Sequence, residues 1–241
     1  MRVLATDLDG TFLGGSDHDR AELYARFRGE RPGWRLVFVT GRDLPFVQGL
    51  VETGLVPAPD FVIGDVGTTV VDAGFAPVDA VQDAIASLWG ARSAEVMAML
   101  ADEPGLRLQP GDWLGRRRVS YYYEPAQLRD STLRKVEEAG LDWVTSADVF
   151  FDVLPPGVSK GPTLRRLVEH QGWDAGRVLA AGDTLNDRTL LLEGFPAVAV
   201  GNSEDELQRL VTGVPHVFQA SRQGTGGILE ALHHHRLTDL P

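Results

Sequence analysis

An apolar run near the start of the chain ends in two carboxylates and a glycine turn. Residues 3–5 have the character of a buried strand, and Asp7, Asp9 and Gly10 follow directly. Side chains two residues apart point to the same side of a strand, although a turn at Gly10 can bend the two aspartates apart. Two carboxylates this close repel each other unless one is protonated or a cation lies between them. The pair therefore indicates a metal site or an acid/base pair.

Apolar strands alternate with amphipathic helices over both ends of the chain. Residues 34–39, 61–63, 177–181 and 197–200 are further apolar runs, and helical spacing of apolar residues follows most of them. This alternation predicts an α/β fold with a Rossmann-like parallel sheet and helices on both of its faces. In such sheets ligands bind at the carboxyl ends of the strands.

The pattern changes between about residue 80 and residue 156 to two rounds of helix, strand and strand. This order suggests a smaller α+β domain with an antiparallel sheet. With 241 residues, the chain is long enough for a core and a small second domain. We expect a core of residues 1–79 and 157–241 and an inserted cap domain of residues 80–156, with hinges near residues 79–80 and 155–157.

Polar residues follow the buried strands at the expected ligand-binding edge. Thr40 and Gly41 follow the second strand, and Asp183, Asn186 and Asp187 follow a later one. Oxygen donors at this density suit Mg²⁺, which binds few carboxylates and keeps several waters. The Thr40 hydroxyl can cap the next helix, and that role is compatible with a contact to phosphate.

A glycine-flanked lysine adds a positive charge to this set. Lys160 precedes Gly161 and an expected helix over residues 162–171. The dipole and the free amides of a helix N-terminus favour an anion, and the lysine adds a full charge. Lys160 is therefore predicted to contact phosphate.

Composition limits the partners. The formal net charge of −11 and a pI near 4.9 give no indication of a nucleic-acid or membrane surface. No apolar run approaches the roughly 20 residues that span a bilayer, and the first strand begins directly after Met1. We expect a cytoplasmic protein. The absence of cysteine excludes disulfides, thiolate metal sites and a cysteine nucleophile.

Taken in order, these motifs resemble those of the haloacid dehalogenase superfamily, whose members mostly hydrolyse phosphate esters through an aspartyl phosphate. The motifs are Asp-x-Asp-Gly-Thr at 7–11, Thr-Gly-Arg at 40–42, Ser-Lys-Gly at 159–161 and Gly-Asp-x-x-Asn-Asp at 182–187. The insertion between the second and third motifs resembles the type IIB cap. Residues 38–42, 66–68, 118–121 and 152–155 with 159–161 resemble the sucrose-phosphate phosphatase-like branch, although Arg118 stands where that branch often has lysine.

The resemblance implies a role for each motif. Asp7 would be the nucleophile, and Asp9 would be the general acid and then the general base. Mg²⁺ would be bound by Asp7, the main-chain carbonyl of Asp9 and Asp183, with Asp187 in support. The phosphoryl group would be held by Leu8, Thr40, Gly41, Lys160 and Asn186.

The cap would close over the site and select the alcohol half of the substrate. We expect Gly67, Thr68, Arg118 and Tyr121 to contact that half. Arginine and aromatic side chains suit carbohydrates, through forked hydrogen bonds and stacking. For Arg118 and Tyr121 the alternative is a polar outer face over a packed tyrosine layer.

These inferences predict a Mg²⁺-dependent phosphatase, a monomer or homodimer, whose partner is a small phosphorylated sugar or glycosyl compound. One alternative is a sugar phosphomutase of the type IIB phosphomannomutase kind, which shares the two-aspartate opening. Another is a module that binds a phosphate ligand without catalysis. The presence of Asp7, Asp9, Lys160 and Asp183 argues against the last alternative.

Overall fold

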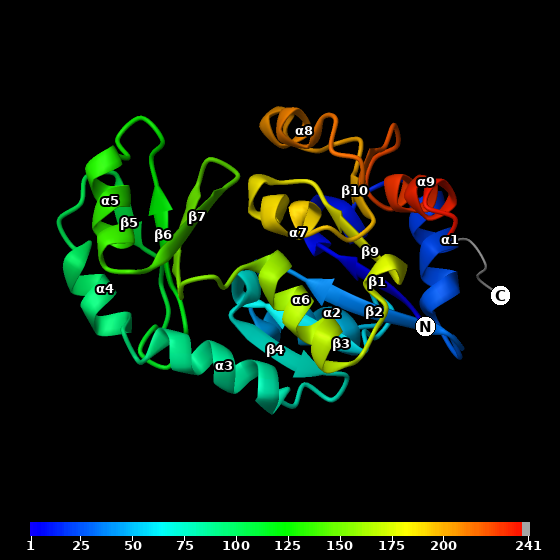
Figure 1. Cartoon of the computed structure of the whole chain (residues 1–241), viewed down its shortest axis with the longest axis horizontal. Coiled ribbons are helices and arrows are strands. Elements are labelled where there is room, and N and C mark those ends of the chain that lie inside the picture. The colour runs from blue at the N-terminus through cyan, green and yellow to red at the C-terminus, as the bar shows by residue number, and fades with distance from the viewer. Residues whose placement is uncertain (238–241) are drawn as a thin grey trace.

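The computed structural model describes residues 1–237, which form two separate β-sheets (Figure 1). The larger sheet carries both ends of the described chain, and the smaller one lies at the far end of the long axis. No helix among these residues is both long and apolar enough to cross a lipid bilayer.

The larger sheet has the order β11-β10-β9-β1-β2-β3-β4. All neighbouring strands are parallel except β3 and β4, which pair antiparallel. The strands are β1 (Arg2–Thr6), β2 (Trp34–Val39), β3 (Phe61–Gly64), β4 (Thr69–Asp72), β9 (Val178–Gly182), β10 (Ala197–Ala199) and β11 (Val217–Gln219). The parallel sheet predicted from the alternation of strands and helices is therefore confirmed.

Helices cover both faces of this sheet. One face carries α3 (Asp79–Trp89), α6 (Lys160–His170), α7 (Arg188–Leu192) and α8 (Asp205–Val211), and the other carries α1 (Asp17–Phe27), α2 (Leu44–Glu52) and α9 (Thr225–His234). Because side chains alternate along a strand, Val3 and Ala5 of β1 pack into one apolar cluster and Leu4 packs into the other. Burial on both faces explains why the central strands are almost continuously apolar.

Short helical turns link several of these elements. They are η1 (Leu8–Phe12), η2 (Asp65–Gly67), η3 (Ala175–Arg177) and η4 (Leu185–Asp187). The turn η2 directly follows β3, while η1 and η4 follow the first residues after β1 and β9. These turns therefore bring the polar motifs to one edge of the sheet.

The smaller sheet is antiparallel, with the order β5-β6-β8-β7. Its elements are α4 (Ser93–Met99), β5 (Leu106–Leu108), β6 (Val119–Tyr123), α5 (Asp130–Glu138), β7 (Asp142–Ser146) and β8 (Phe150–Leu154). We call this part the cap. It has an apolar cluster of its own, which includes Trp113, Tyr121, Val136 and Phe151. The antiparallel sheet matches the expectation, while the domain boundaries at residues 80 and 156 stay predictions.

One helix begins earlier than expected, and another contains two glycines. Helix α6 begins at Lys160 rather than at residue 162, because a proline is tolerated anywhere in a first turn that needs no amide donor. Helix α9 begins at Thr225, so Gly226 and Gly227 lie inside it. A β carbon at Gly227 would lie 3.0 Å from the Val200 side chain. Close packing of α9 on the sheet therefore explains why position 227 is a glycine.

We expect Phe151→Ala to destabilise the cap by about 3–5 kcal/mol, since its fully buried ring packs between Tyr121 and Trp143. Denaturant unfolding followed by tryptophan fluorescence measures the change. The control is Leu114→Ala, whose side chain is 66% exposed in the same part of the chain. Equal losses in the two variants would contradict a separate packed cap core.

Candidate active site

The carboxyl ends of β1, β2 and β9 meet at one edge of the larger sheet. Thr6 of β1 lies in register with Phe38 of β2 and Ala181 of β9. The residues that follow these strands therefore arrive together, as the sequence predicted. The Asp7 amide donates to the Ala181 carbonyl at 2.9 Å, which fixes the end of β1 beside β9.

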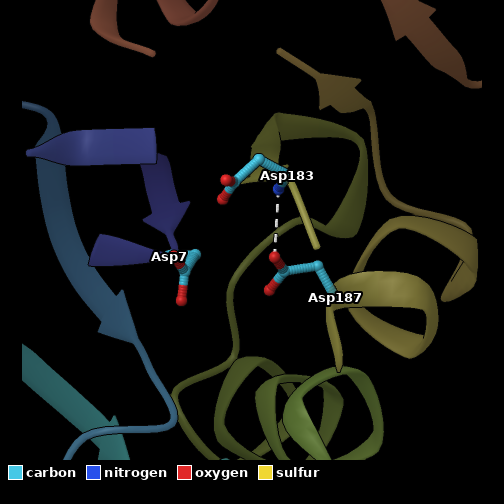
Figure 2. A group of neighbouring side chains, drawn as sticks. All are labelled: Asp7, Asp183 and Asp187. Carbon is cyan, nitrogen blue, oxygen red and sulfur yellow. Dashed lines mark hydrogen bonds between the residues drawn. The ribbon is translucent and has the colours of Figure 1, made fainter. Parts of the chain in front are cut away.

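Three buried carboxylates converge at this edge. Asp7, Asp183 and Asp187 each offer an oxygen within 4.8 Å of the others, and Figure 2 shows them around a common space between the end of β1 and the loop after β9. The Asp187 Oδ2 accepts hydrogen bonds from the Asp183 amide at 3.0 Å and the Thr184 amide at 3.1 Å. The Thr11 hydroxyl donates to Asp183 Oδ1 at 2.7 Å. A set of oxygen donors that are largely fixed in place suits a hard divalent cation.

Lys160 lies among these carboxylates and is completely buried. Its Nζ donates to Asp7 Oδ1 at 2.7 Å, Asn186 Oδ1 at 2.6 Å and Asp187 Oδ1 at 2.7 Å. Burial alone disfavours the ammonium, but the attraction of Asp187 and Asp7 is stronger in sum and raises the Lys160 pKa above its ordinary value. The lysine therefore stays charged and uses all three of its protons.

One ammonium does not balance three buried carboxylates. Burial is the main cause that raises the pKa of Asp7 well above its ordinary value, with Lys160 acting in the opposite direction. Burial and the neighbouring Asp187 raise the pKa of Asp183 to about 7. Without a cation these carboxyls resist ionisation, so the site favours a bound positive charge.

Asp9 points away from this cluster. Its carboxylate forms a two-pronged ion pair with Arg42, through Nε at 2.8 Å and Nη2 at 3.0 Å, and both side chains are 51% exposed. The turn after Asp9 needs glycine, since Gly10 has φ +76° and a β carbon there would lie 2.1 Å from Asp183 Oδ2. The bend at Gly10 therefore separates the two aspartates of the first motif, as the sequence allowed.

A cleft of about 380 Å³ opens beside these residues. Asp7, Asp9, Gly41 and Asn186 line it from the larger sheet, while Trp113, Arg116, Arg118, Phe150 and Asp152 line it from the cap. Thr40 and Lys160 are fully buried beneath this surface, and the side chain of Leu8 is buried in the apolar core. The Thr40 hydroxyl accepts a hydrogen bond from the Arg42 amide at 3.1 Å.

The four predicted substrate residues do not all face the cleft. Arg118 lines it. Tyr121 is only 3% exposed and packs in the cap core, where its hydroxyl donates to the Val96 carbonyl. Thr68 is buried, and a β carbon on Gly67 would lie 2.5 Å from the backbone of Ser159. These three residues support the wall of the cleft rather than form it.

Several residues at the site were not predicted. Asn202 follows β10 and donates to the Gly10 carbonyl at 3.1 Å and to Asp183 Oδ2 at 3.4 Å. Asp183 was predicted because it follows a buried strand, and the same reasoning could have identified Asn202. Asp43 and Asp65 of the larger domain form ion pairs with Arg116 of the cap. No spacing in the sequence indicates those pairs, because the partners lie more than 50 residues apart.

Comparisons with known proteins agree on one family. The family model for sucrose-6F-phosphate phosphohydrolase matches residues 1–236. The chain is 41% identical to glucosylglycerol-phosphate synthase of Pseudomonas anguilliseptica over 96% of its own length, but spans only 30% of that relative. It is 30% identical to mannosylfructose-phosphate phosphatase of Agrobacterium fabrum, covering 97% of this chain and 96% of the relative.

A solved structure has the same fold. The sucrose-phosphatase of Synechocystis sp. PCC6803, in complex with sucrose and phosphate, superposes with a TM-score of 0.88 at 23% identity. The match covers 98% of this chain and 99% of that one. The larger sheet and the cap therefore occur together in a known phosphatase.

We expect the melting temperature of the metal-free protein to fall between pH 4 and pH 7. Over this range the unfolded chain has lost the Asp183 proton, whose ordinary pKa is 3.8, while the folded chain keeps it up to about 7. The folded state binds more protons, so its stability decreases as the pH rises. Calorimetry in a chelator tests this, with Asp183→Asn as the control. An equally steep decline in that variant would show that Asp183 is not the source.

Proposed function

This chain belongs to the sucrose-6F-phosphate phosphohydrolase family of haloacid dehalogenase-type phosphatases, and we propose that it is a Mg²⁺-dependent hydrolase of a phosphorylated glycosyl compound. The observation that carries this proposal is the buried cluster of Asp7, Lys160, Asp183 and Asp187 beside an open cleft. The cluster combines a candidate nucleophile, a cation site and a fixed positive charge. These are the parts that phosphoryl transfer to a carboxylate requires.

The donor set fits Mg²⁺. Asp7 and Asp183 would bind the ion together with the main-chain carbonyl of Asp9. Both oxygens of Asp187 already accept hydrogen bonds, from Lys160 and from two amides, so Asp187 would act by fixing the Asp183 loop and Lys160. When bound, the ion would reduce the repulsion between the nucleophile and the phosphate.

The side chains divide the reaction between them. Asp7 would attack phosphorus to form an aspartyl phosphate, and Asp9 would protonate the leaving alcohol and then take a proton from the attacking water. Asp9 must release at least one of its Arg42 contacts to do so, and its exposure on the wall of the cleft permits that movement. Lys160 holds Asp7 in place, and Asn186 accepts a hydrogen bond from Lys160. Both side chains, with Thr40 and the amides of Leu8 and Gly41, would hold the phosphoryl oxygens.

The cap supplies the wall that would contact the alcohol half of the substrate. Trp113 and Arg118 line the cleft from the cap. Two relatives carry names that refer to phosphorylated glycosyl compounds, glucosylglycerol phosphate and mannosylfructose phosphate. We infer a substrate of that kind, with Arg118 as one contact and with Gly67, Thr68 and Tyr121 supporting the wall. The cytoplasmic location and the monomeric or homodimeric state stay predictions.

A panel of sugar phosphates and glycosyl-glycerol phosphates, assayed with and without Mg²⁺, tests this function. We expect Mg²⁺-dependent release of inorganic phosphate from at least one glycosyl ester. Movement of phosphate within a hexose, without net release, would instead support the phosphomutase alternative. Absence of turnover across the panel would support a ligand-binding module.

We expect Asp7→Asn to lower kcat by at least ~10³, as removal of other covalent nucleophiles does. The measurement is phosphate release at saturating substrate and Mg²⁺. Asp17→Asn is the matched control, because Asp17 lies on the exposed start of α1 and pairs with Arg20 of the same helix. Near-normal turnover in Asp7→Asn would refute the nucleophile assignment.

For Asp9→Asn we expect breakdown of the aspartyl phosphate to slow more than its formation with a good leaving group, because the attacking water loses its base. Rapid quenching with a ³²P-labelled aryl phosphate should then show a labelled protein that accumulates. A variant that turns over slowly and holds no label at any time would count against the two-step scheme.

A further inference from the structure

Two carboxylates of the larger domain contact the arginines that face the cleft from the cap. Arg116 donates through Nη1 to Asp65 Oδ1 at 3.1 Å and through Nη2 to Asp43 Oδ2 at 3.3 Å. Arg118 donates through Nη2 to the same Asp65 oxygen at 2.9 Å. Its Nη1 donates to Asp152 Oδ1, within the cap, at 3.0 Å.

These pairs use both terminal nitrogens of each guanidinium. Recognition of a carboxylate by arginine normally needs a free edge of the fork, with two parallel donors. The third arginine of the cleft, Arg42, is already paired with Asp9. Each arginine that lines the cleft in the described chain already has a carboxylate partner, so a carboxylate on the substrate would have to compete with that partner for the guanidinium.

The local charge balance points the same way. Around Arg116 and Arg118 lie three carboxylates, those of Asp43, Asp65 and Asp152. A substrate carboxylate placed beside them would meet a surplus of negative charge in a partly enclosed cleft, where screening by solvent is weaker than at an open surface. An uncharged hydroxyl group would meet no such repulsion.

The backbone holds Asp43 and Asp65 in these positions. Asp65 and Val66 are consecutive non-glycine residues in the left-handed region, at φ +53° and +58°, a rare arrangement that is unfavourable for residues with a β carbon. The other Asp65 oxygen accepts from the Thr69 hydroxyl at 2.8 Å. Asp43 is the N-cap of α2, where its Oδ1 accepts from the Phe46 amide. Both carboxylates are therefore fixed before a substrate arrives.

We propose that Asp43 and Asp65 are specificity-determining residues, which neutralise Arg116 and Arg118 so that the cleft accepts esters of uncharged polyols and rejects esters whose alcohol half carries a carboxylate. The inference deepens the proposed phosphatase function and rests on it. Neither residue needs to touch the substrate, because each acts through the arginine that it holds. The discrimination arises from repulsion and from competition with Asp43 and Asp65 for the two guanidinium groups, rather than from an added attraction.

A matched pair of small esters tests this directly. sn-Glycerol 3-phosphate and 3-phosphoglycerate differ in whether the end of the alcohol half is a hydroxymethyl group or a carboxylate. In the wild-type protein with Mg²⁺ we expect kcat/KM for the glycerol ester to be higher by about tenfold or more, the factor that corresponds to about 1.4 kcal/mol. In the double variant Asp43→Asn, Asp65→Asn we expect this ratio to fall at least tenfold, as the freed arginines accept the carboxylate.

We expect both substitutions to keep the fold. Asparagine is as good an N-cap as aspartate and tolerates the left-handed region, so each change removes the negative charge and keeps one acceptor oxygen. Asp174→Asn is the control, since Asp174 is the N-cap of η3, is 68% exposed and does not line the cleft. Its ester ratio should match that of the wild-type protein. Equal losses for both esters in the double variant, with an unchanged ratio, would show a merely structural role and overturn the proposal.

A binding measurement separates this proposal from the proposed function. The Kd of each ester is measured by calorimetry on Asp7→Asn with Mg²⁺, with and without the two additional substitutions, so no turnover is needed. Tighter binding of the glycerol ester, reduced or reversed in the triple variant, supports the proposal even if the protein releases no phosphate. Equal affinity for the two esters, a preference for 3-phosphoglycerate, or no binding of either would overturn it, whatever the phosphatase assay shows.

Discussion

The burial of one ammonium among three carboxylates is the interaction on which the rest of the site depends. Lys160 has no exposed surface and donates to Asp7, Asn186 and Asp187. Removing either side of such a buried pair leaves an uncompensated charge, which costs about 3–5 kcal/mol. The elements that hold these groups, β1, α6 and the loop after β9, are therefore fixed relative to one another. Because one ammonium cannot balance three carboxylates, the same arrangement that stabilises the edge of the sheet also prepares it for a divalent cation.

A second set of charges connects the larger domain with the cap. Asp43 ends the loop that follows β2, Asp65 directly follows β3, and both pair with Arg116. The cleft thus lies between two sets of polar residues. One is the buried set of Asp7, Lys160, Asp183 and Asp187, and the other is the partly exposed set of Asp43, Asp65, Arg116 and Arg118, which we propose faces the alcohol half of an ester. In the proposed function, chemistry and selectivity are therefore carried by different residues.

The tendency of ligands to bind at the carboxyl ends of parallel strands is enough to identify most residues of the buried site from the sequence. Asp7, Thr40 and Asp183 come together because β1, β2 and β9 are parallel neighbours in register, and an alternation of apolar strands and helices is enough to predict that. The same tendency says less about the direction in which each side chain points. Asp9 turns toward Arg42 and Thr40 lies beneath the cleft, while Tyr121 packs inward, since the alternation along β6 does not say which face meets the cap core.

The sequence by itself determined the class of fold, the order of the motifs and the set of acidic residues at the edge of the sheet, because hydrophobic periodicity and strand ends are local properties of the chain. Only the tertiary structure decided which charges pair. Asp65 meets Arg116 and Arg118 across 51 and 53 positions, and Asn202 meets Gly10 across 192. Such contacts depend on how the cap is placed on the larger sheet and on two left-handed residues at 65 and 66. A periodic pattern contains no information about either.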